Sequence, residues 1–447
     1  MSNSSQIYFA VLQSSLLLFA AGCASDKLSN PQVKAATAQT VSCHASNDPF
    51  AEGTDLAESA KALAKTARSA ADWNAVAVNW LQAIQQLQTV PLKDPKRIFA
   101  QKKVKEYLAA LENAQQKALQ NRSLLSFPTF NSQLLDEQLL LYLSYIAAMG
   151  VPDVLIVGSS RSLQGVDPQQ LQQSLATQGK GELKVFNFGI NGATAQVIDL
   201  LLRQVLTPEQ LPKLIIWADG TRAFNSGRTD RTYNAIASSP GYQQILAGIR
   251  PSWPVQPPAT VTPCPPPPSS PTPTTTPSQT LSPLKIFLAL TASDSKVATT
   301  DSSGFLPLDN RFDPETYYQK FPKVSGKYDS DYANFQLTGQ QGDALNAVTN
   351  FTKSQNISLI IVNLPLTEEY LDPFRRRYEQ EFNQAVEKLS KDKGFVFINF
   401  SQLWLNQYHY FLDPSHLNRY GAAAVSQQLA QEKRIIWPVR SPETPAK

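Results

Sequence analysis

The sequence predicts an α/β protein organised around a doubly wound parallel sheet. Between about residues 134 and 435, short apolar segments rich in β-branched residues alternate with longer segments of helical periodicity. Strands of a parallel sheet have this continuous apolar composition because helices cover both faces of the sheet. A long Pro-rich stretch interrupts the alternation and predicts a surface insertion, and a separate helical region precedes the sheet.

The predicted elements alternate between strand and helix along this region. The alternation, with right-handed crossovers, predicts a flavodoxin-like arrangement of the α/β class. We expect strands at 153–157, 184–188, 213–217, 358–363 and 395–399, and helices near 167–178, 194–206, 338–355, 372–392 and 418–433.

Residues 1–23 resemble a bacterial lipoprotein signal peptide. The apolar stretch from Ile7 to Ala21 has signal-peptide length and is followed, after one Gly, by Cys23. We therefore expect export, lipidation of Cys23, and a periplasmic or membrane-anchored location, with the polar residues 24–50 as a linker. A buried hydrophobic helix is the alternative interpretation of the apolar stretch.

Residues 51–133 are predicted to be helical. Apolar residues recur at helical spacing from Trp73 to Leu87 and again from Ala100 to Ala118, with a Pro-containing turn between the two stripes. This pattern predicts an antiparallel helical hairpin. The hairpin either packs on the main domain, serves as a spacer from the membrane, or docks a protein partner.

The insertion is expected at 222–337, between the third and fourth strands. Its centre, 251–283, is so rich in Pro that it can form neither a normal helix nor a sheet ladder, which predicts an extended, disordered loop. Such a loop is either a surface excursion or a ligand for a partner's binding module. The segment 312–321, rich in Tyr, Phe and Asp, is expected to fold over the sheet edge as a lid, and 436–447 to be a tail.

The composition excludes several classes of function. The 447 residues carry a formal net charge of +4 with both signs mixed along the chain, which provides no basic stripe for nucleic acid. Three His and three Cys residues without paired spacing argue against a zinc site, and neither a metal nor an organic cofactor is expected. In an exported protein, Cys43 and Cys264 could form a disulfide.

Candidate catalytic residues occur at two places. Ser160 follows the first predicted strand, in the turn Gly158-Ser159-Ser160, and ligands bind at the carboxyl ends of strands in such sheets. Asp413 and His416 lie in a loop before the last predicted helix. Together the three residue types supply the nucleophile, the base and the orienting carboxylate of Ser-based acyl transfer. Separately, they also fit an ordinary turn and a helix cap beside a surface His.

These motifs together resemble the SGNH, or GDSL-type, hydrolase superfamily over about residues 134–435. Three family blocks are matched in chain order. The nucleophile block is matched by Gly158-Ser159-Ser160, the second block by NFGING at 187–192, and the last block by Asp413 and His416 within LDPSHLNRYG at 412–421.

The resemblance implies a role for each matched residue. It implies that Ser160 is the nucleophile, that His416 is the base, and that Asp413 orients the imidazole. It also implies an oxyanion hole formed by the backbone N–H groups of Ser160 and Gly192. No metal or cofactor belongs to this mechanism.

The third family block, Gly-x-Asn-Asp, is not matched. The third predicted strand leads into WADG at 217–220, and the simplest alignment puts Ala218 where the family has an oxyanion-binding Asn. We expect the Asp219 carboxylate to pair with Arg161 or Arg222. Arg161 either holds an anionic glycan or phosphate or forms an internal ion pair. We therefore consider Arg161, Asp219 and Arg222 to be candidate substrate-binding residues.

The sequence motifs VLIVGSSRSLQGVDP at 154–168 and NLPL at 363–366 are similar to those of uncharacterised exported bacterial SGNH-like proteins. These are distant relatives of proteins that O-acylate cell-surface polysaccharides and teichoic acids. The resemblance implies a serine esterase or O-acyltransferase acting on a cell-envelope or exopolysaccharide component. The alternative is a non-catalytic protein that binds a glycan or an assembly partner through the same crevice.

Overall fold

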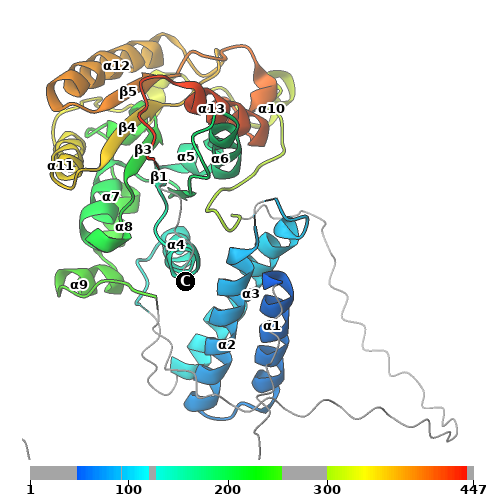
Figure 1. Cartoon of the computed structure of the whole chain (residues 1–447). Helices are drawn as coiled ribbons and strands as arrows, with labels where there is room; N and C mark the ends of the chain where they lie inside the picture. The colour runs from blue at the N-terminus through cyan, green and yellow to red at the C-terminus, as the bar shows by residue number, and fades with distance from the viewer. Residues whose placement is uncertain (1–47, 92, 120–126, 254–299, 440–447) are drawn as a thin grey trace, which may run out of the picture. The chain divides into compact units, whose positions relative to one another are not determined.

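The computed structural model describes residues 48–439 except 92, 120–126 and 254–299 (Figure 1). These residues form helices and a parallel β-sheet, as the sequence predicts. The signal peptide with Cys23, most of the linker, nearly all of the Pro-rich centre and the end of the tail lie outside the described residues. The expectations for these segments, including the Cys43–Cys264 pair, stay predictions.

The central sheet has five parallel strands in the order β2-β1-β3-β4-β5. The predicted parallel sheet is confirmed, and each strand begins and ends within two residues of its predicted range. Val154 of the inner strand β1 lies opposite Val185 of β2 on one side and Leu214 of β3 on the other, so both neighbours of this position are apolar. The strands are β1 (Val154–Gly158), β2 (Val185–Gly189), β3 (Leu214–Asp219), β4 (Ser358–Asn363) and β5 (Val396–Asn399).

Helices cover both faces of the sheet because the side chains of each strand alternate between the faces (Figure 1). In β1, Leu155 and Val157 belong to one apolar cluster, whereas Val154 and Ile156 belong to the other. The first face is covered by α7 (Ala195–Leu200) with its π-helical continuation η1 (Leu201–Val205), α11 (Gln340–Ser354) and α12 (Pro373–Lys393). The second is covered by α5 (Ser160–Gly165), α6 (Pro168–Thr177) and α13 (Arg419–Gln431).

The N-terminal region contains three helices where the sequence analysis expected a two-helix hairpin. They are α1 (Pro49–Thr66), α2 (Ala70–Thr89) and α3 (Arg97–Leu119), and α2 packs against both of the others. The third helix, α1, shows no stripe of large apolar residues in the sequence because its buried face consists of the small residues Gly53, Ala57 and Ala60. A capping box formed by Ser69 and Asp72 separates α1 from α2.

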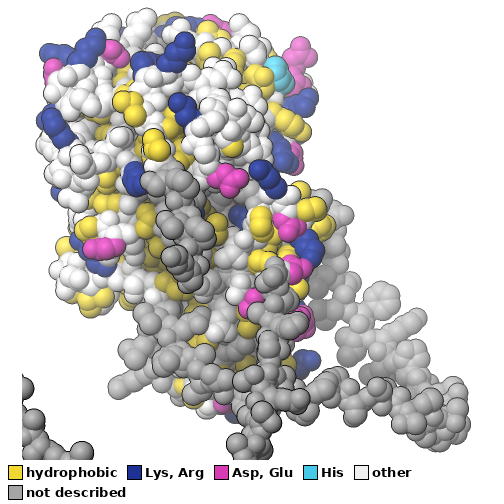
Figure 2. All heavy atoms as spheres, in the orientation of Figure 1, with side chains coloured by type: hydrophobic (Ala, Val, Ile, Leu, Met, Phe, Trp, Pro, Cys, Tyr) yellow, Lys and Arg dark blue, Asp and Glu magenta, His cyan; other side chains and the backbone are white. Residues whose placement is uncertain are grey.

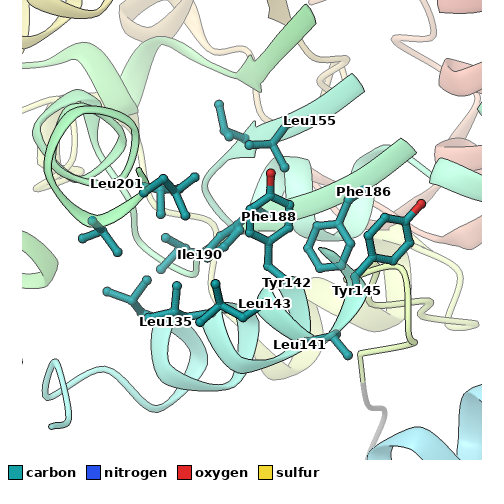
Figure 3. Packing of buried hydrophobic residues seen from close by; sticks show 14 of the residues in the cluster. Leu135, Leu141, Tyr142, Leu143, Tyr145, Leu155, Phe186, Phe188, Ile190 and Leu201 are labelled. Carbon is teal, nitrogen blue, oxygen red and sulfur yellow. The ribbon is translucent and has the colours of Figure 1, made fainter. Parts of the chain in front are cut away.

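Helix α4 (Gln133–Met149) precedes β1 and packs on β2. Figure 3 shows its Tyr142 and Tyr145 against Phe186, with ring centroids 5.0 and 5.3 Å apart. The same helix contacts α2, where Nε2 of Gln88 donates to Oγ of Ser144 at 2.6 Å. Helix α4 therefore connects the N-terminal helices to the sheet domain.

The described part of the insertion folds into short helices at the margin of the sheet. Several backbone hydrogen bonds attach its returning segment, among them that from Asn187 N to Ser303 O at 2.8 Å and that from Phe312 N to Phe411 O at 2.7 Å. The elements of this part are the 3₁₀ turns η3 (Thr221–Phe224) and η4 (Gly326–Tyr328) and the helices α8 (Arg231–Ala237), α9 (Pro240–Leu246) and α10 (Pro314–Lys320). The remaining short elements are η2 (Pro208–Gln210), η5 (Tyr408–Tyr410), β6 (Phe411–Asp413) and β7 (His416–Leu417).

The surface carries charges of both signs. On the face shown in Figure 2, Lys and Arg side chains are interspersed with Asp, Glu and uncharged surface. Among the helices that the structure describes, none combines the length and the apolar composition needed to cross a bilayer.

Candidate active site

Ser160 lies in a sharp turn between β1 and α5, which we call the serine turn (residues 158–162). Gly158 makes the turn possible because its φ is +144°, and a Cβ there would lie 2.2 Å from the carbonyl oxygen of Ala218. Ser159 then caps α5, with its Oγ accepting from the N–H of Arg161 at 3.3 Å. Ser160 is the first residue of the helix, at the carboxyl edge of the sheet.

The Asp219 carboxylate, at the end of β3, holds the serine turn from behind. It accepts hydrogen bonds from Ser159 N at 2.8 Å, Ser159 Oγ at 2.9 Å and Gly220 N at 2.9 Å. The expected ion pair with Arg161 or Arg222 is absent from this described region, since the neutral donors of the turn occupy the carboxylate instead. Burial raises the pKa of Asp219, and the charge of Arg161 and these hydrogen bonds oppose the increase only in part.

Asp413 and His416 lie on a tight antiparallel pair of strands, which we call the histidine turn (residues 413–416). The sequence analysis expected a loop, but Asp413 ends β6 and His416 begins β7, and the two residues are opposite each other in the register. Oδ1 of Asp413 accepts from Ser415 N at 2.8 Å and from His416 N at 2.9 Å. The carboxylate of Asp413 thus stabilises the turn that places His416 beside it.

The structure brings Ser160, His416 and Asp413 together in one chain of hydrogen bonds, although Ser160 lies 256 residues before His416. Oγ of Ser160 is 2.9 Å from Nε2 of His416, and Nδ1 of His416 is 2.8 Å from Oδ2 of Asp413. Burial would raise the pKa of Asp413, but the hydrogen bond and charge of His416 hold that pKa below its usual value. The carboxylate is therefore ionised at neutral pH and can orient the imidazole.

The resemblance to SGNH hydrolases implies that the backbone N–H groups of Ser160 and Gly192 form an oxyanion hole, and both N–H groups are available for this role. Within the described part of the chain, neither the N–H of Ser160 nor that of Gly192 has an acceptor. Gly192 has a φ of +71°, and a Cβ there would come within 2.6 Å of Oγ1 of Thr232. The loop that follows β2 can therefore adopt this conformation with Gly at position 192 and would be strained with other residues.

Ala218 cannot replace the oxyanion-binding Asn of the SGNH pattern, because its side chain has no donor and it is fully buried in β3 opposite Val362. Asn225 is also occupied, since its Nδ2 donates to the carbonyls of Asp331 and Ala333. The first basic side chain beyond β3 belongs to Arg222. Its Nη2 is 3.4 Å from Oγ of Ser415, so this guanidinium borders the histidine turn.

The two candidate arginines have different surroundings. Arg161 is only 4% exposed, and its Nη2 donates to the carbonyls of Leu364 at 2.7 Å and Pro365 at 3.0 Å. It therefore ties the serine turn to the segment after β4. Arg222 is partly exposed, and its nearest carboxylate, on Asp331, is 3.7 Å away. Of the two, Arg222 is better placed to meet a ligand.

Two Asn residues of the matched blocks position the site, a role that was not predicted from the sequence. Nδ2 of Asn187, in β2, donates to Ser162 O at 2.8 Å and to Val166 O at 2.9 Å, which fixes α5 against the sheet. Asn418 caps α13 with its Oδ1 and donates through Nδ2 to Phe411 O at 3.1 Å, which fixes β6. The preference for Asn as a helix cap is a signal that could have assigned this role to Asn418, whereas for Asn187 the signal is its place in the motif NFGING.

No cluster of metal-binding side chains occurs among the residues that the structure describes. The hydrogen-bonded hydroxyl of Ser160 and imidazole of His416 can perform proton transfer and nucleophilic attack.

Comparisons with known proteins add little to this geometry. No protein-family profile and no curated protein matches the chain. Among solved structures, the chain is similar to a GDSL-like lipase from Bacteroides thetaiotaomicron, with 12% sequence identity and a TM-score of 0.30 over 66% of this chain and 98% of that chain. At this level of similarity, the chemistry of the site has to be inferred from its own residues.

Proposed function

We propose that this protein is a serine esterase or O-acyltransferase in which Ser160, His416 and Asp413 form the catalytic triad. The observation that carries this proposal is the continuous chain of hydrogen bonds, 2.9 Å from Ser160 to His416 and 2.8 Å from His416 to Asp413. A Ser and a His whose side chains meet by chance have no reason to have a carboxylate hydrogen-bonded to the second imidazole nitrogen. This third partner distinguishes an activated hydroxyl from an ordinary surface contact.

Acyl transfer would begin with the proton on Nδ1 of His416 directed to Asp413. Nε2 then accepts the proton of Ser160 as Oγ attacks the carbonyl carbon of an ester. The negative charge that develops on the carbonyl oxygen is stabilised by the N–H groups of Ser160 and Gly192. When the tetrahedral intermediate collapses, the alkoxy group leaves with the proton from His416, and the acyl group stays on Ser160.

The second half of the reaction reverses these proton transfers. Water or an acceptor hydroxyl loses its proton to Nε2 of His416 and attacks the acyl group on Ser160. Attack by water releases a carboxylic acid, whereas attack by a hydroxyl completes an O-acyl transfer. In both cases His416 returns the proton to Oγ of Ser160.

The proposed substrate is an acylated component of the cell envelope or an exopolysaccharide. This part of the proposal is supported by the similarity of the sequence at 154–168 to exported SGNH-like proteins and by the lipoprotein-type signal that ends at Cys23. Lipidation of Cys23 would hold the protein at a membrane surface. If so, Cys23→Ser transfers the full-length protein from the membrane fraction to the soluble fraction, and an unchanged distribution contradicts the anchor.

Covalent labelling by a fluorophosphonate probe tests the catalytic proposal. We expect the probe to label the wild-type protein and to label neither Ser160→Ala nor His416→Ala, because only an activated Ser reacts readily. Ser162→Ala is the matched control, since its Oγ lies in the same turn but donates to Ser159 O at 2.9 Å. Absence of labelling in a wild-type protein with a cooperative thermal transition would contradict the catalytic proposal.

One observation favours a second candidate, a non-catalytic protein that binds a glycan or a partner. Ala218 stands where the SGNH pattern has an oxyanion-binding Asn, and loss of one such donor typically lowers turnover by about 10²–10³-fold. Binding of oligosaccharides by an unlabelled, folded wild-type protein would support this candidate. Labelling that depends on both Ser160 and His416 would exclude it.

A further inference from the structure

A pocket of about 180 Å³ adjoins the histidine turn. Its wall includes residues 413–415 of the histidine turn and, from the insertion, Tyr317, Tyr318 and residues 321–324. The carboxylate of Asp413 faces both this pocket and Nδ1 of His416, whose Nε2 contacts Ser160. The pocket is therefore separated from the nucleophile by one imidazole ring and two hydrogen bonds.

The wall of the pocket is aromatic and held in place. Tyr317 lies 5.0 Å from Phe321 and 5.4 Å from Tyr318 between ring centroids. Behind them, the buried Phe312 packs edge-on against Tyr317 at 5.2 Å, and its N–H donates to Phe411 O in β6. Phe321 is nevertheless 57% exposed. An aromatic ring that is both anchored and exposed offers a flat apolar face at little cost in conformational entropy.

The polar groups of the pocket are balanced in charge. Nζ of Lys323 lies 2.6 Å from Glu369 and 5.4 Å from the centre of the Tyr318 ring. Arg375 is already bound, with Nη2 2.9 Å from Asp329 and Nη1 3.0 Å from the carboxylate of Asp372. The partly exposed Lys323–Glu369 pair thus offers both a hydrogen-bond donor and an acceptor beside the aromatic wall.

This combination selects among the ligands of an esterase. An acyl chain would have to remove water from Lys323 and Glu369 without replacing its hydrogen bonds, which is unfavourable. An anionic group would meet the carboxylates of Glu369 and Asp413, and the two cations of the pocket, Lys323 and Arg375, are already paired with carboxylates. A sugar ring has an apolar face for Phe321 and hydroxyl groups that can both donate and accept. Because 180 Å³ is well below the roughly 300–1,000 Å³ of a complete small-molecule site, one ring of a longer ligand fits best.

We propose that this aromatic pocket binds one sugar unit of an uncharged polysaccharide and so presents an ester on a neighbouring unit to Ser160. The proposal rests on the proposed esterase function and names its substrate class. Phe321 and Tyr317 are specificity-determining residues in this scheme, whereas the triad performs the chemistry.

Kinetics with two substrates test the pocket separately from the triad. The variants are Phe321→Ala and Tyr317→Ala, with Tyr328→Ala as the matched control, because Tyr328 is 76% exposed and does not line the pocket. The substrates are p-nitrophenyl acetate and partly O-acetylated cello-, xylo- and chito-oligosaccharides. We expect both pocket variants to raise KM for at least one oligosaccharide by about three- to tenfold, as loss of an aromatic contact implies. We expect kcat, and all constants for p-nitrophenyl acetate, to stay within twofold of wild type.

The outcomes separate failure of the pocket from failure of the esterase proposal. If wild type hydrolyses p-nitrophenyl acetate but Phe321→Ala leaves KM unchanged for every oligosaccharide, or no oligosaccharide is a substrate, the sugar pocket is wrong and the esterase proposal stands. If neither substrate is hydrolysed, isothermal titration of the same oligosaccharides decides. Binding that Phe321→Ala weakens and Tyr328→Ala does not would support the pocket alone, and no binding would overturn it.

Discussion

The serine turn and the histidine turn are each held by one Asp, but the two carboxylates lie in different electrostatic surroundings. Asp219 accepts only neutral donors, from Ser159 and Gly220, and burial raises its pKa. Asp413 accepts two similar backbone donors and in addition faces an imidazole, and its pKa is lowered. Both carboxylates accept hydrogen bonds from backbone N–H groups of their turns, whereas only that of Asp413 also contacts an imidazole.

This difference shows which carboxylate can take part in proton transfer. A carboxylate that contacts an imidazole gains stabilisation when the ring becomes protonated, as it does during attack by Ser160. Asp219 has no such partner, so its contribution is to hold the N–H and Oγ of Ser159 in place. We therefore treat Asp413 as catalytic and Asp219 as a positioning residue, and the following variants test that distinction.

The largest effect is expected for Asp413→Asn. An Asn at position 413 can still accept from Ser415 N and His416 N, but its amide would donate to Nδ1 of His416 and favour the wrong tautomer. We expect kcat for p-nitrophenyl acetate to fall by about 10⁴-fold with little change in thermal stability. A decrease of less than about 100-fold would show that Asp413 shapes the turn without assisting the imidazole.

A third carboxylate, that of the partly buried Asp301, extends the comparison to a residue outside the candidate active site. Its Oδ1 accepts from Ser303 N at 2.8 Å and Ser303 Oγ at 2.7 Å, and burial raises its pKa from 3.8 to about 6. The folded state therefore holds a proton that the unfolded state has released between about pH 4 and 6, so stability falls as the pH rises through this window.

We expect this loss to reach about 3 kcal/mol, from about 2 pKa units at 1.36 kcal/mol each. In Asp301→Asn, urea unfolding should show a smaller decrease in the free energy of unfolding between pH 4 and 7 than in wild type. An identical decrease in the variant would mean that Asp301 titrates normally in the folded protein.

A smaller effect is expected at Asp219. Asp219→Ala leaves the buried N–H and Oγ of Ser159 without their acceptor, which should lower the free energy of unfolding by about 1–3 kcal/mol. Asp219→Asn retains an acceptor and should lose less than half as much. Urea unfolding measures both, and a stability of Asp219→Ala equal to that of wild type would show that the serine turn does not depend on this carboxylate.

The smallest effect is expected for Ser415→Ala. Oγ of Ser415 lies 3.3 Å from Oδ1 of Asp413, 3.3 Å from Nδ1 of His416 and 3.4 Å from Arg222, all long contacts. We expect kcat/KM to fall by less than about tenfold, in line with one neutral hydrogen bond. A decrease as large as that of Asp413→Asn would place Ser415 within the catalytic relay.

Much of the sheet domain could be predicted from local sequence. Buried parallel strands are short apolar runs, and helices such as α6, α12 and α13 begin at Asp167, Asp372 and Asn418, each of which caps its helix. Ser160, His416 and Asp413 also stood out, because a strand-end Ser and an Asp-x-x-His motif are recognisable as short patterns. Residues 51–66 were predicted to be helical, but α1 was not recognised as a separate third helix because its small buried residues leave no apolar stripe.

Local sequence thus revealed the strands, most of the helices and the residue types of the triad, because propensity, capping and short motifs depend on neighbours in the chain. The tertiary structure decided what each polar group contacts. Complementary charge suggested that Asp219 pairs with an Arg, but packing placed it against Ser159, 60 residues away. In the same way, only the folded chain brings α10 beside residues 413–415 and creates the aromatic pocket. Contacts between distant segments follow from how helices and strands pack, which no short stretch of sequence specifies.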